Sequence, residues 1–316
     1  MKRLILFAVT LAVILTGNAW AREPMDAGAD LSLDLENPVL FLSQLDSAGA
    51  TDPDDGTYGS GTFTRQTKSV GWELGGLVAG VTALGAFSWD WGSSSFHGNP
   101  EGWFGKDSGS LGMDKLGHAW STYMISEFLT DRIEANSGGG EGAEITAFLL
   151  SYGLMSYVEL FDGYSADHGF SYEDMVMNAL GGGFSYLRRR VPGLREKVDF
   201  RFEYWPSGNV DGFHPVTDYS GQKYLLALKF SGFEGARDTP LRFLELHAGY
   251  YARGFTQAER DRFEPRRREP YVGIGINLGE LLFGYPSVRD TGPGKIGRRV
   301  LEYVQIPYAY GATSMD

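Results

Sequence analysis

The chain has 316 residues, 42% of them hydrophobic, which is enough for one large or two smaller folded units. Its 40 acidic and 28 basic side chains give a formal net charge of −12, which argues against nucleic acid as a partner and against electrostatic docking on anionic lipid. Cysteine is absent, so we expect neither disulfides nor the acylated cysteine of a bacterial lipoprotein.

The N-terminal segment, residues 1–21, has the pattern of a secretory signal peptide. Lys2 and Arg3 provide a basic start, residues 4–15 are apolar, and Ala-Trp-Ala at 19–21 fits a cleavage site. The apolar run is short for a membrane span, which favours cleavage and export. Residues 22–68 are acidic and rich in Gly, Ser, Thr and Asp, so they predict a flexible lead-in, within which residues 38–45 could form a short docked segment.

Helical patterns follow in the region 69–192. Residues 70–89 are apolar and long enough for a membrane span, but Glu73 lies inside them; a span and a buried or interfacial helix both remain open. Three further helices are predicted over residues 114–135, 144–161 and 172–190. The last of these begins after a capping-box-like Ser171 and ends at three arginines, 188–190, for which we expect a solvated helix end.

After residue 192 the apolar period changes from helical to two. Residues 199–204, 224–230, 244–252 and 272–278 alternate in this way, which predicts antiparallel strands with one apolar face. That face could cover the helices or face lipid, and we favour packing on the helices. A final short helix is predicted at 297–305. The expected fold is α+β: an apolar bundle of about four helices (69–192), then an antiparallel sheet of about four strands (193–316).

Polar residues recur at helical spacing within the apolar bundle. Asp114 and His118 are four residues apart and share a helix face, and Asp174 and Asn178 repeat this spacing. If the helices bundle, these groups could converge at one end, where a carboxylate beside an imidazole can form an acid/base pair. The candidate catalytic residues are Asp114, His118 and Asp174. The candidate binding residues, or buried polar network, are Asp114, Lys115, His118, Glu159, Asp162, Ser171, Asp174 and Asn178.

Structural roles account for the same residues. Asp114 could be a helix N-cap, Asp174 the third residue of a capping box, and His118 a core histidine. The sequence has no pair of histidines or cysteines at metal-ligand spacing, so it predicts neither a metal site nor a cofactor, although one His with several carboxylates could hold a cation. His247 lies on the polar side of a predicted strand, where we expect solvent.

The motifs together resemble a known family. They are Asp114-Lys115-x-x-His118, Glu159-x-x-Asp162-Gly163, and Gly169-Phe170-Ser171-x-x-Asp174-x-x-x-Asn178-x-x-Gly181. The chain resembles the YfiM-like predicted periplasmic lipoproteins, a domain of unknown function, over roughly residues 70–308, and it is more weakly similar to VanZ-like membrane proteins. The resemblance implies a periplasmic location with outer-membrane association and brings no established activity. Lacking the lipoprotein cysteine, the chain would have to attach through its helices or its sheet.

These observations predict an exported, membrane-associated cell-envelope protein. Its polar network would be structural, or would bind lipid or an envelope protein partner; the sequence does not define an oligomeric state. The alternative is a hydrolase of lipid or cell-wall material, with His118 as base, Asp114 orienting it, and Asp174 or Glu159 as a second acid or cation ligand.

Overall fold

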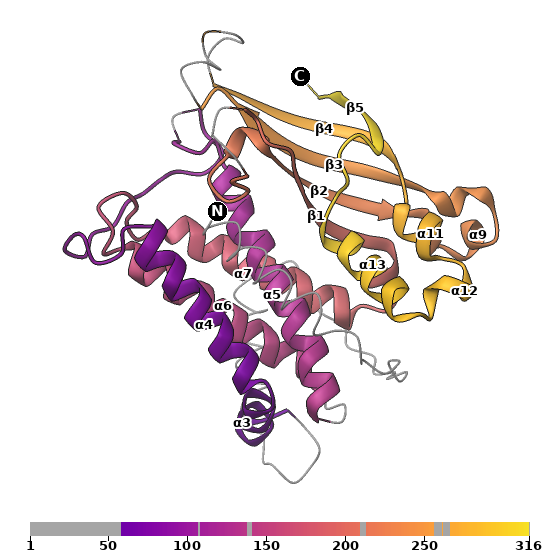
Figure 1. Cartoon of the computed structure of the whole chain (residues 1–316), viewed down its shortest axis with the longest axis horizontal. Helices are drawn as coiled ribbons and strands as arrows, with labels where there is room; N and C mark the ends of the chain where they lie inside the picture. Colours follow the sequence, from indigo (N-terminus) through magenta and orange to yellow (C-terminus); the bar gives the residue numbers. More distant parts are fainter. Residues whose placement is uncertain are drawn as a thin grey trace.

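The computed structural model describes residues 58–106, 108–137, 141–208, 213–255, 261 and 266–315. The predicted signal peptide (1–21) and residues 22–57 of the predicted lead-in, with the segment 38–45, lie outside the described residues. Within the described part, helices come first and a five-stranded antiparallel sheet follows (Figure 1). The predicted α+β class, with about four bundle helices before the sheet, is confirmed.

The bundle is built around α5 (Met113–Ser137). This helix packs against α6 (Ala143–Asp162) and α7 (Tyr172–Arg190), and it also contacts the first two strands. Its core side chains include Tyr123, Leu129 and Ile133, none of which reaches solvent. Each apolar side chain buried in this way contributes roughly 1.5–3 kcal/mol to the stability of the fold.

Helical structure begins before residue 69, where the sequence predicts the bundle to start. Helix α3 (Ser60–Ser69) lies in the stretch predicted as a flexible lead-in. Its Gln66 is fully buried, donates to the carbonyl of Glu141 at 3.2 Å and accepts from Thr146 Oγ1 at 2.5 Å. A polar side chain with both ends hydrogen-bonded to distant residues fixes α3 against α6, and local composition does not reveal such contacts.

Helix α4 (Gly71–Ser88) lies on the outside of the bundle (Figure 1). Only Leu77 and Gly85 of this apolar helix are buried, whereas Trp72 and Phe87 are 94% and 82% exposed. A buried helix was one of the alternatives that the sequence left open for this segment, and α4 is not buried. Among the described residues, no individual helix has the length and apolarity to cross a membrane, while α3 and α4 together, bent by 70°, meet those two criteria.

The sheet has its strands in sequence order, each antiparallel to the next. Four strands correspond to the four alternating segments of the sequence: β1 (Val198–Tyr204), β2 (Gln222–Lys229), β3 (Leu244–Arg253) and β4 (Arg267–Ile276). The fifth, β5 (Tyr310–Ser314), pairs with β4 and was not predicted, because Tyr-Gly-Ala-Thr-Ser has no apolar alternation.

The apolar face of the sheet packs on the helices over part of its area. The rings of Phe202 and Trp120 lie 5.1 Å apart, and those of Phe200 and Tyr123 lie 5.8 Å apart. The expected packing on the helices is correct there. Farther from the bundle, the same face leaves five aliphatic side chains 40–60% exposed: Leu226, Leu246, Val272, Ile274 and Ile276.

Short elements connect the strands and close the chain. Helix α13 (Gly292–Tyr303) replaces the predicted helix at 297–305; it begins earlier because Thr291 caps it, accepting from Gly294 N. The ring of Tyr303 packs 5.6 Å from that of Tyr123, so α13 lies against the bundle. The other short helices are α8 (Leu194–Lys197), α9 (Glu234–Arg237), α11 (Leu278–Phe283) and α12 (Pro286–Arg289), with 3-10 turns at Tyr219–Gly221, Phe230–Gly232 and Pro240–Phe243.

A buried ion-pair network joins the bundle to the sheet. Arg188 of α7 is 1% exposed and contacts Glu127 of α5 at 3.2 Å and Asp199 of β1 at 2.7 Å. Arg189 contacts Glu127 at 2.9 Å. The expected solvated helix end is thus wrong for both arginines, because carboxylates distant in sequence surround them.

The burial of His247 also differs from the prediction, for a similar reason. It is 2% exposed, and its Nε2 lies 2.7 Å from Glu245 Oε1. Glu245 in turn accepts from Arg201 at 2.7 Å, so this face of β1 and β3 is polar yet buried. The predicted solvent exposure of His247 is wrong, because alternation identifies a polar face without showing whether it is covered.

Candidate functional site

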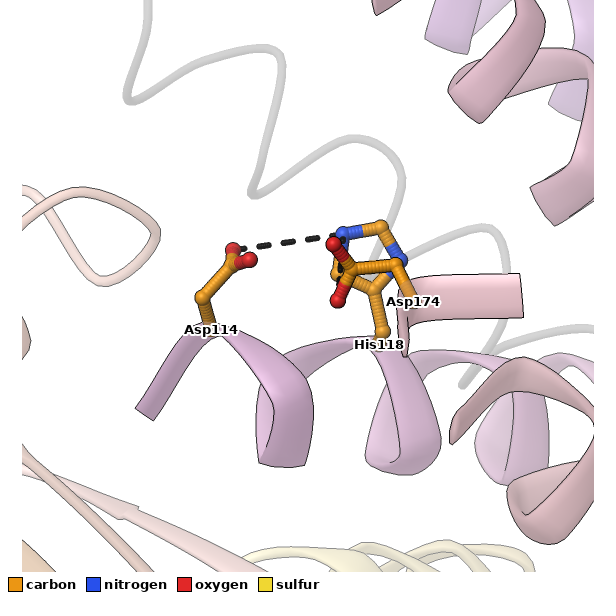
Figure 2. A group of neighbouring side chains, drawn as sticks. All are labelled: Asp114, His118 and Asp174. Atoms are coloured by element: carbon orange, nitrogen blue, oxygen red, sulfur yellow. Dashed lines mark ion pairs between the residues drawn. The ribbon is translucent and has the colours of Figure 1, made fainter. Parts of the chain in front are cut away.

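Polar side chains converge where α5 begins, α6 ends and α7 begins. Asp114 and His118 project from one face of α5, one turn apart, and Asp174 of α7 points toward both (Figure 2). The i, i+4 spacing of the first pair creates this arrangement within α5. Only the packing of α7 on α5 adds Asp174.

Lys115 lies at the buried side of the cluster. It is 0% exposed, and its Nζ donates to Glu101 Oε2 at 2.6 Å and to Asp174 Oδ2 at 2.7 Å. Its distance to Asp114 Oδ2 is 3.3 Å. A buried ammonium group needs such partners because desolvating an unpaired charge costs several kcal/mol. Lys115 therefore organises three carboxylates around one cation.

His118 faces three carboxylates with one ring nitrogen. Its Nε2 lies 3.4 Å from Glu159 Oε1, 3.9 Å from Asp114 Oδ1 and 4.0 Å from Asp174 Oδ1. The other nitrogen, Nδ1, lies 3.2 Å from Asn178 Oδ1. Thr122 Oγ1 donates to the same Asn178 oxygen at 3.0 Å. The amide of Asn178 thereby holds the imidazole with Nε2 toward the acidic groups.

Helix capping positions the α7 residues. Ser171 is the N-cap, and its Oγ accepts from the backbone N–H of Asp174, which is one half of the predicted capping box. The other half, a bond from the Ser171 N–H to the Asp174 side chain, is not formed. The N–H of Ser171 donates to Glu159 Oε2 at 3.1 Å, which ties the start of α7 to the end of α6. Asp114 is not an N-cap, because α5 already begins at Met113. Its carboxylate is consequently free to face the cluster.

The crowding of carboxylates changes their acidity. Burial, with Asp114 and Asp174 nearby, raises the pKa of Glu101 to about 7, and burial raises the pKa of Glu159 to about 8. Burial opposes the charged form of His118, but Asp114, Asp174 and Glu159 raise its pKa to about 9. The site therefore holds protons near neutral pH that isolated carboxyl and imidazole groups would release.

The site is open to solvent on one side. The side chains of Asp114 and Glu101 are each 24% exposed and that of His118 is 14% exposed, whereas Glu159 and Asp174 are almost fully covered. The accessible side of the cluster is therefore the one that carries Glu101, Asp114 and His118.

The structure brings together most of the residues that the sequence singled out. One connected set of hydrogen bonds and ion pairs joins Asp114, Lys115, His118, Glu159, Ser171, Asp174 and Asn178. Asp162 instead accepts from Trp91 Nε1 at 2.6 Å.

Two contributors were missed in the sequence. Glu101 comes from the loop before α5, and Tyr219 follows β1 and donates from its hydroxyl to Asp114 Oδ1 at 3.3 Å. Neither belongs to a periodic segment, so no local signal identifies them.

A set of metal-ligand atoms also emerges. Asp114, His118 and Asp174 each offer one donor atom, and the three atoms lie within 4.8 Å of one another. Spacing along the chain predicts no metal site because it shows only one histidine. The tertiary contact between α5 and α7 provides the donor set that spacing does not show.

Comparison with known proteins gives one family match. A family model described as "Predicted periplasmic lipoprotein (DUF2279)" matches residues 100–190, the segment with Glu101 and helices α5, α6 and α7. Searches of curated proteins and of solved structures found no match. Across the segment that carries the site, the chain is thus similar to a family of predicted periplasmic lipoproteins of unknown function, which fits an exported protein of the cell envelope.

Proposed function

We propose that this chain is an exported envelope protein that lies on a lipid surface through α4 and uses the polar site of the neighbouring bundle helices to bind a ligand. The observation that carries the proposal is the outer face of α4, which is apolar and exposed. Trp72 and Phe87 stand near its two ends and are 94% and 82% exposed. Large exposed aromatic side chains on an apolar helix are typical of interfacial membrane contact.

The charge of α4 supports the same proposal. Its sequence contains one ionisable residue, Glu73, which lies 2.7 Å from Arg132 Nη2 of α5. The charge of Glu73 is therefore balanced on the bundle side, and the outer face presents no ion to lipid. An apolar face without charge can enter the boundary between headgroups and acyl chains at little electrostatic cost. Attachment through α4 needs no acylated cysteine.

The polar site is connected to α4 by the segment that follows it. This segment first places Trp91 against Asp162 at the end of α6, and then brings Glu101 to Lys115. Seating α4 on a bilayer would thus fix the loop that contributes to the site. The ligand would be bound close to the membrane, where lipid headgroups and envelope proteins are both available as partners.

The alternative function is a hydrolase with His118 as general base. The distance of 3.9 Å from His118 Nε2 to Asp114 Oδ1 supports an acid/base pair. However, the carboxylates raise the pKa of His118 to about 9, which keeps the ring protonated at neutral pH. A protonated imidazole can donate a proton but cannot accept one, so this arrangement favours binding over general-base catalysis.

The proposal also includes the resemblance to two named families and the membrane on which α4 would lie. The motifs at Asp114–His118 and Ser171–Asn178 underlie the resemblance to YfiM-like and VanZ-like proteins, and they fall inside the matched segment 100–190. The similarity to a family of predicted periplasmic lipoproteins suggests that the membrane contacted by α4 is the outer membrane.

Vesicle flotation tests the proposal. The purified chain is mixed with phosphatidylethanolamine–phosphatidylcholine vesicles, and the bound fraction is measured for wild type, Trp72→Ser and Trp205→Ser. Trp205 is a matched control because it is 58% exposed and lies beyond β1. Losing one buried aromatic contact costs roughly 1.5 kcal/mol, which predicts about a ten-fold weaker partition for Trp72→Ser and no change for Trp205→Ser.

Salt dependence gives a second criterion. Binding through an uncharged helix face should persist at high ionic strength, because salt screens only electrostatic attraction. Equal flotation of wild type and Trp72→Ser, or binding that disappears in salt, would reject α4 as the membrane surface.

A further inference from the structure

The cluster at the start of α5 contains more acid than base. Glu101, Asp114, Glu159 and Asp174 provide four carboxyl groups, against Lys115 and His118 as basic partners. If all of these groups are ionised, two negative charges remain without a basic partner. A divalent cation supplies the missing charge in one step.

Asp174 shows where such an ion would lie. Its Oδ2 accepts from Lys115 Nζ at 2.7 Å, whereas its Oδ1 is buried and has no hydrogen-bond partner. The residue as a whole is 2% exposed, so solvent does not satisfy this oxygen. Oδ1 is also the atom that faces His118 Nε2. A buried carboxylate oxygen without a partner is costly, and a bound cation removes that cost.

A comparable carboxylate elsewhere shows why the surroundings matter. Glu203 of β1 is 3% exposed, its Oε1 lies 3.0 Å from Lys223 Nζ, and its Oε2 has no hydrogen-bond partner. Like Asp174, Glu203 has one oxygen paired with a lysine and one buried oxygen without a partner. Within the described part of the chain, however, it is not in a group of residues whose ligand atoms could hold a metal ion. The convergence of donors distinguishes Asp174.

We infer that Asp114, His118 and Asp174 bind one divalent transition-metal ion, such as Zn²⁺ or Mn²⁺, with Glu159 beside it. This inference names the ligand class of the proposed binding site, but it does not depend on attachment of α4 to a membrane.

The distances suit one ion. Ligand atoms about 2.1 Å from a tetrahedral metal lie roughly 3.4 Å from one another. The separations from His118 Nε2 are 3.9 Å to Asp114 and 4.0 Å to Asp174, and all three donor atoms lie within 4.8 Å of one another. Binding one ion therefore requires the donors to close by roughly half an ångström at His118 and by no more than about 1.4 Å between the two carboxylates. His118 is anchored through Nδ1 to Asn178, so Nε2 is the nitrogen directed at the ion. An ion at this position takes the place of the proton that the carboxylates otherwise hold on Nε2, because only a neutral imidazole nitrogen binds a metal.

The donor types indicate the class of metal. An imidazole nitrogen with carboxylate oxygens is typical of Zn²⁺, Mn²⁺ or Fe²⁺, whereas Ca²⁺ and Mg²⁺ prefer oxygen ligands alone. The exposed sides of Asp114 and His118 leave a route for the ion and for a further ligand on it. An ion bound here would keep part of its coordination sphere open to a further ligand, close to the proposed membrane surface.

Metal titration of the purified chain tests the inference. The protein is prepared without a histidine tag and treated with EDTA, and binding of Zn²⁺, Mn²⁺ and Mg²⁺ is measured by calorimetry and elemental analysis. We expect one Zn²⁺ or Mn²⁺ per chain and a higher melting temperature on binding. Asp174→Asn and His118→Gln should each weaken metal binding by about ten-fold or more, whereas Glu203→Gln should retain wild-type affinity.

The outcomes are decisive in either direction. Stoichiometric binding lost in both site variants, but retained in Glu203→Gln, supports the site. Absence of one-to-one binding in wild type, or equal binding by wild type and folded Asp174→Asn, overturns it. Where circular dichroism shows that Asp174→Asn is unfolded, the His118→Gln comparison decides. Metal titration and vesicle flotation are separate measurements. Failure of membrane binding therefore does not affect the metal result, and failure of metal binding does not affect the membrane result.

Discussion

Lys115 donates to one carboxylate oxygen of Asp174 at 2.7 Å and leaves the other oxygen of that group without a hydrogen-bond partner. The two residues lie on different helices, α5 and α7, and both are almost fully buried. The pair therefore fixes the start of α7 against α5, and it also aims a charged oxygen at His118.

Replacement of Lys115 by Met should destabilise the protein strongly. Removing one partner of a buried ion pair leaves uncompensated carboxylates and typically costs about 3–5 kcal/mol. Urea unfolding followed by circular dichroism measures the loss. Lys68→Met, at an exposed position of α3, is the control and should change stability by less than about 0.5 kcal/mol. Similar losses in both variants would contradict the buried role of Lys115.

Gly181 of α7 should not tolerate a methyl group. A Cβ at this position would lie 2.0 Å from the carbonyl oxygen of Ala119, so Ala would push α7 away from α5. We expect Gly181→Ala to cost roughly 1–3 kcal/mol or more in the free energy of unfolding. Gly183→Ala meets no atom within 4 Å and should stabilise the helix by up to about 1 kcal/mol. Thermal melting distinguishes the two, and a stable Gly181→Ala would show that the helices are not in close contact.

Arg188 should matter far more than Arg190, although both end the same helix. Arg188 is buried between Glu127 and Asp199, while Arg190 is 31% exposed with one contact of 3.5 Å to Glu144. Arg188→Met should lower the free energy of unfolding by about 3–5 kcal/mol, and Arg190→Met by no more than about 1 kcal/mol. Denaturant titration of both variants checks this. Equal effects would mean that this network does not join the bundle to the sheet.

Stability should fall in acid because of the same network. Burial by itself disfavours the charged form of Glu127, but Arg189, Arg188 and Arg299 lower its pKa well below the ordinary value of 4.5. Burial also opposes the charged form of Asp131, and Arg189 and Arg299 lower its pKa. A carboxyl group with a depressed folded-state pKa contributes stability above its unfolded pKa, and that contribution is lost as the pH falls through the folded value.

We therefore expect the melting temperature to decline progressively below about pH 4.5. Glu127→Gln should flatten this decline, whereas Glu234→Gln, at an exposed position, should leave it unchanged. A melting temperature that is level from pH 5 to pH 2 in wild type would refute the assignment of the acid response to this network.

Periodicity in the sequence was sufficient for the main elements. A helical period predicted α4 to α7 with ends within a few residues, and a period of two predicted β1 to β4. These patterns are local consequences of burying one face of each element, so they can be read without knowing the partner. The i, i+4 pairs, Asp114 with His118 and Asp174 with Asn178, were visible for the same reason.

Only the tertiary structure decided what those faces and pairs contact. Glu101 joins Lys115 from a loop, and Tyr219 reaches Asp114 from beyond β1. The arginines that end α7 are buried by carboxylates of α5 and β1, while apolar α4 remains on the surface. The sequence by itself determined that α4 to α7 are helices and that β1 to β4 are strands. The packing of distant segments determined burial, charge pairing and the donor set at His118, because these depend on neighbours that no local pattern encodes.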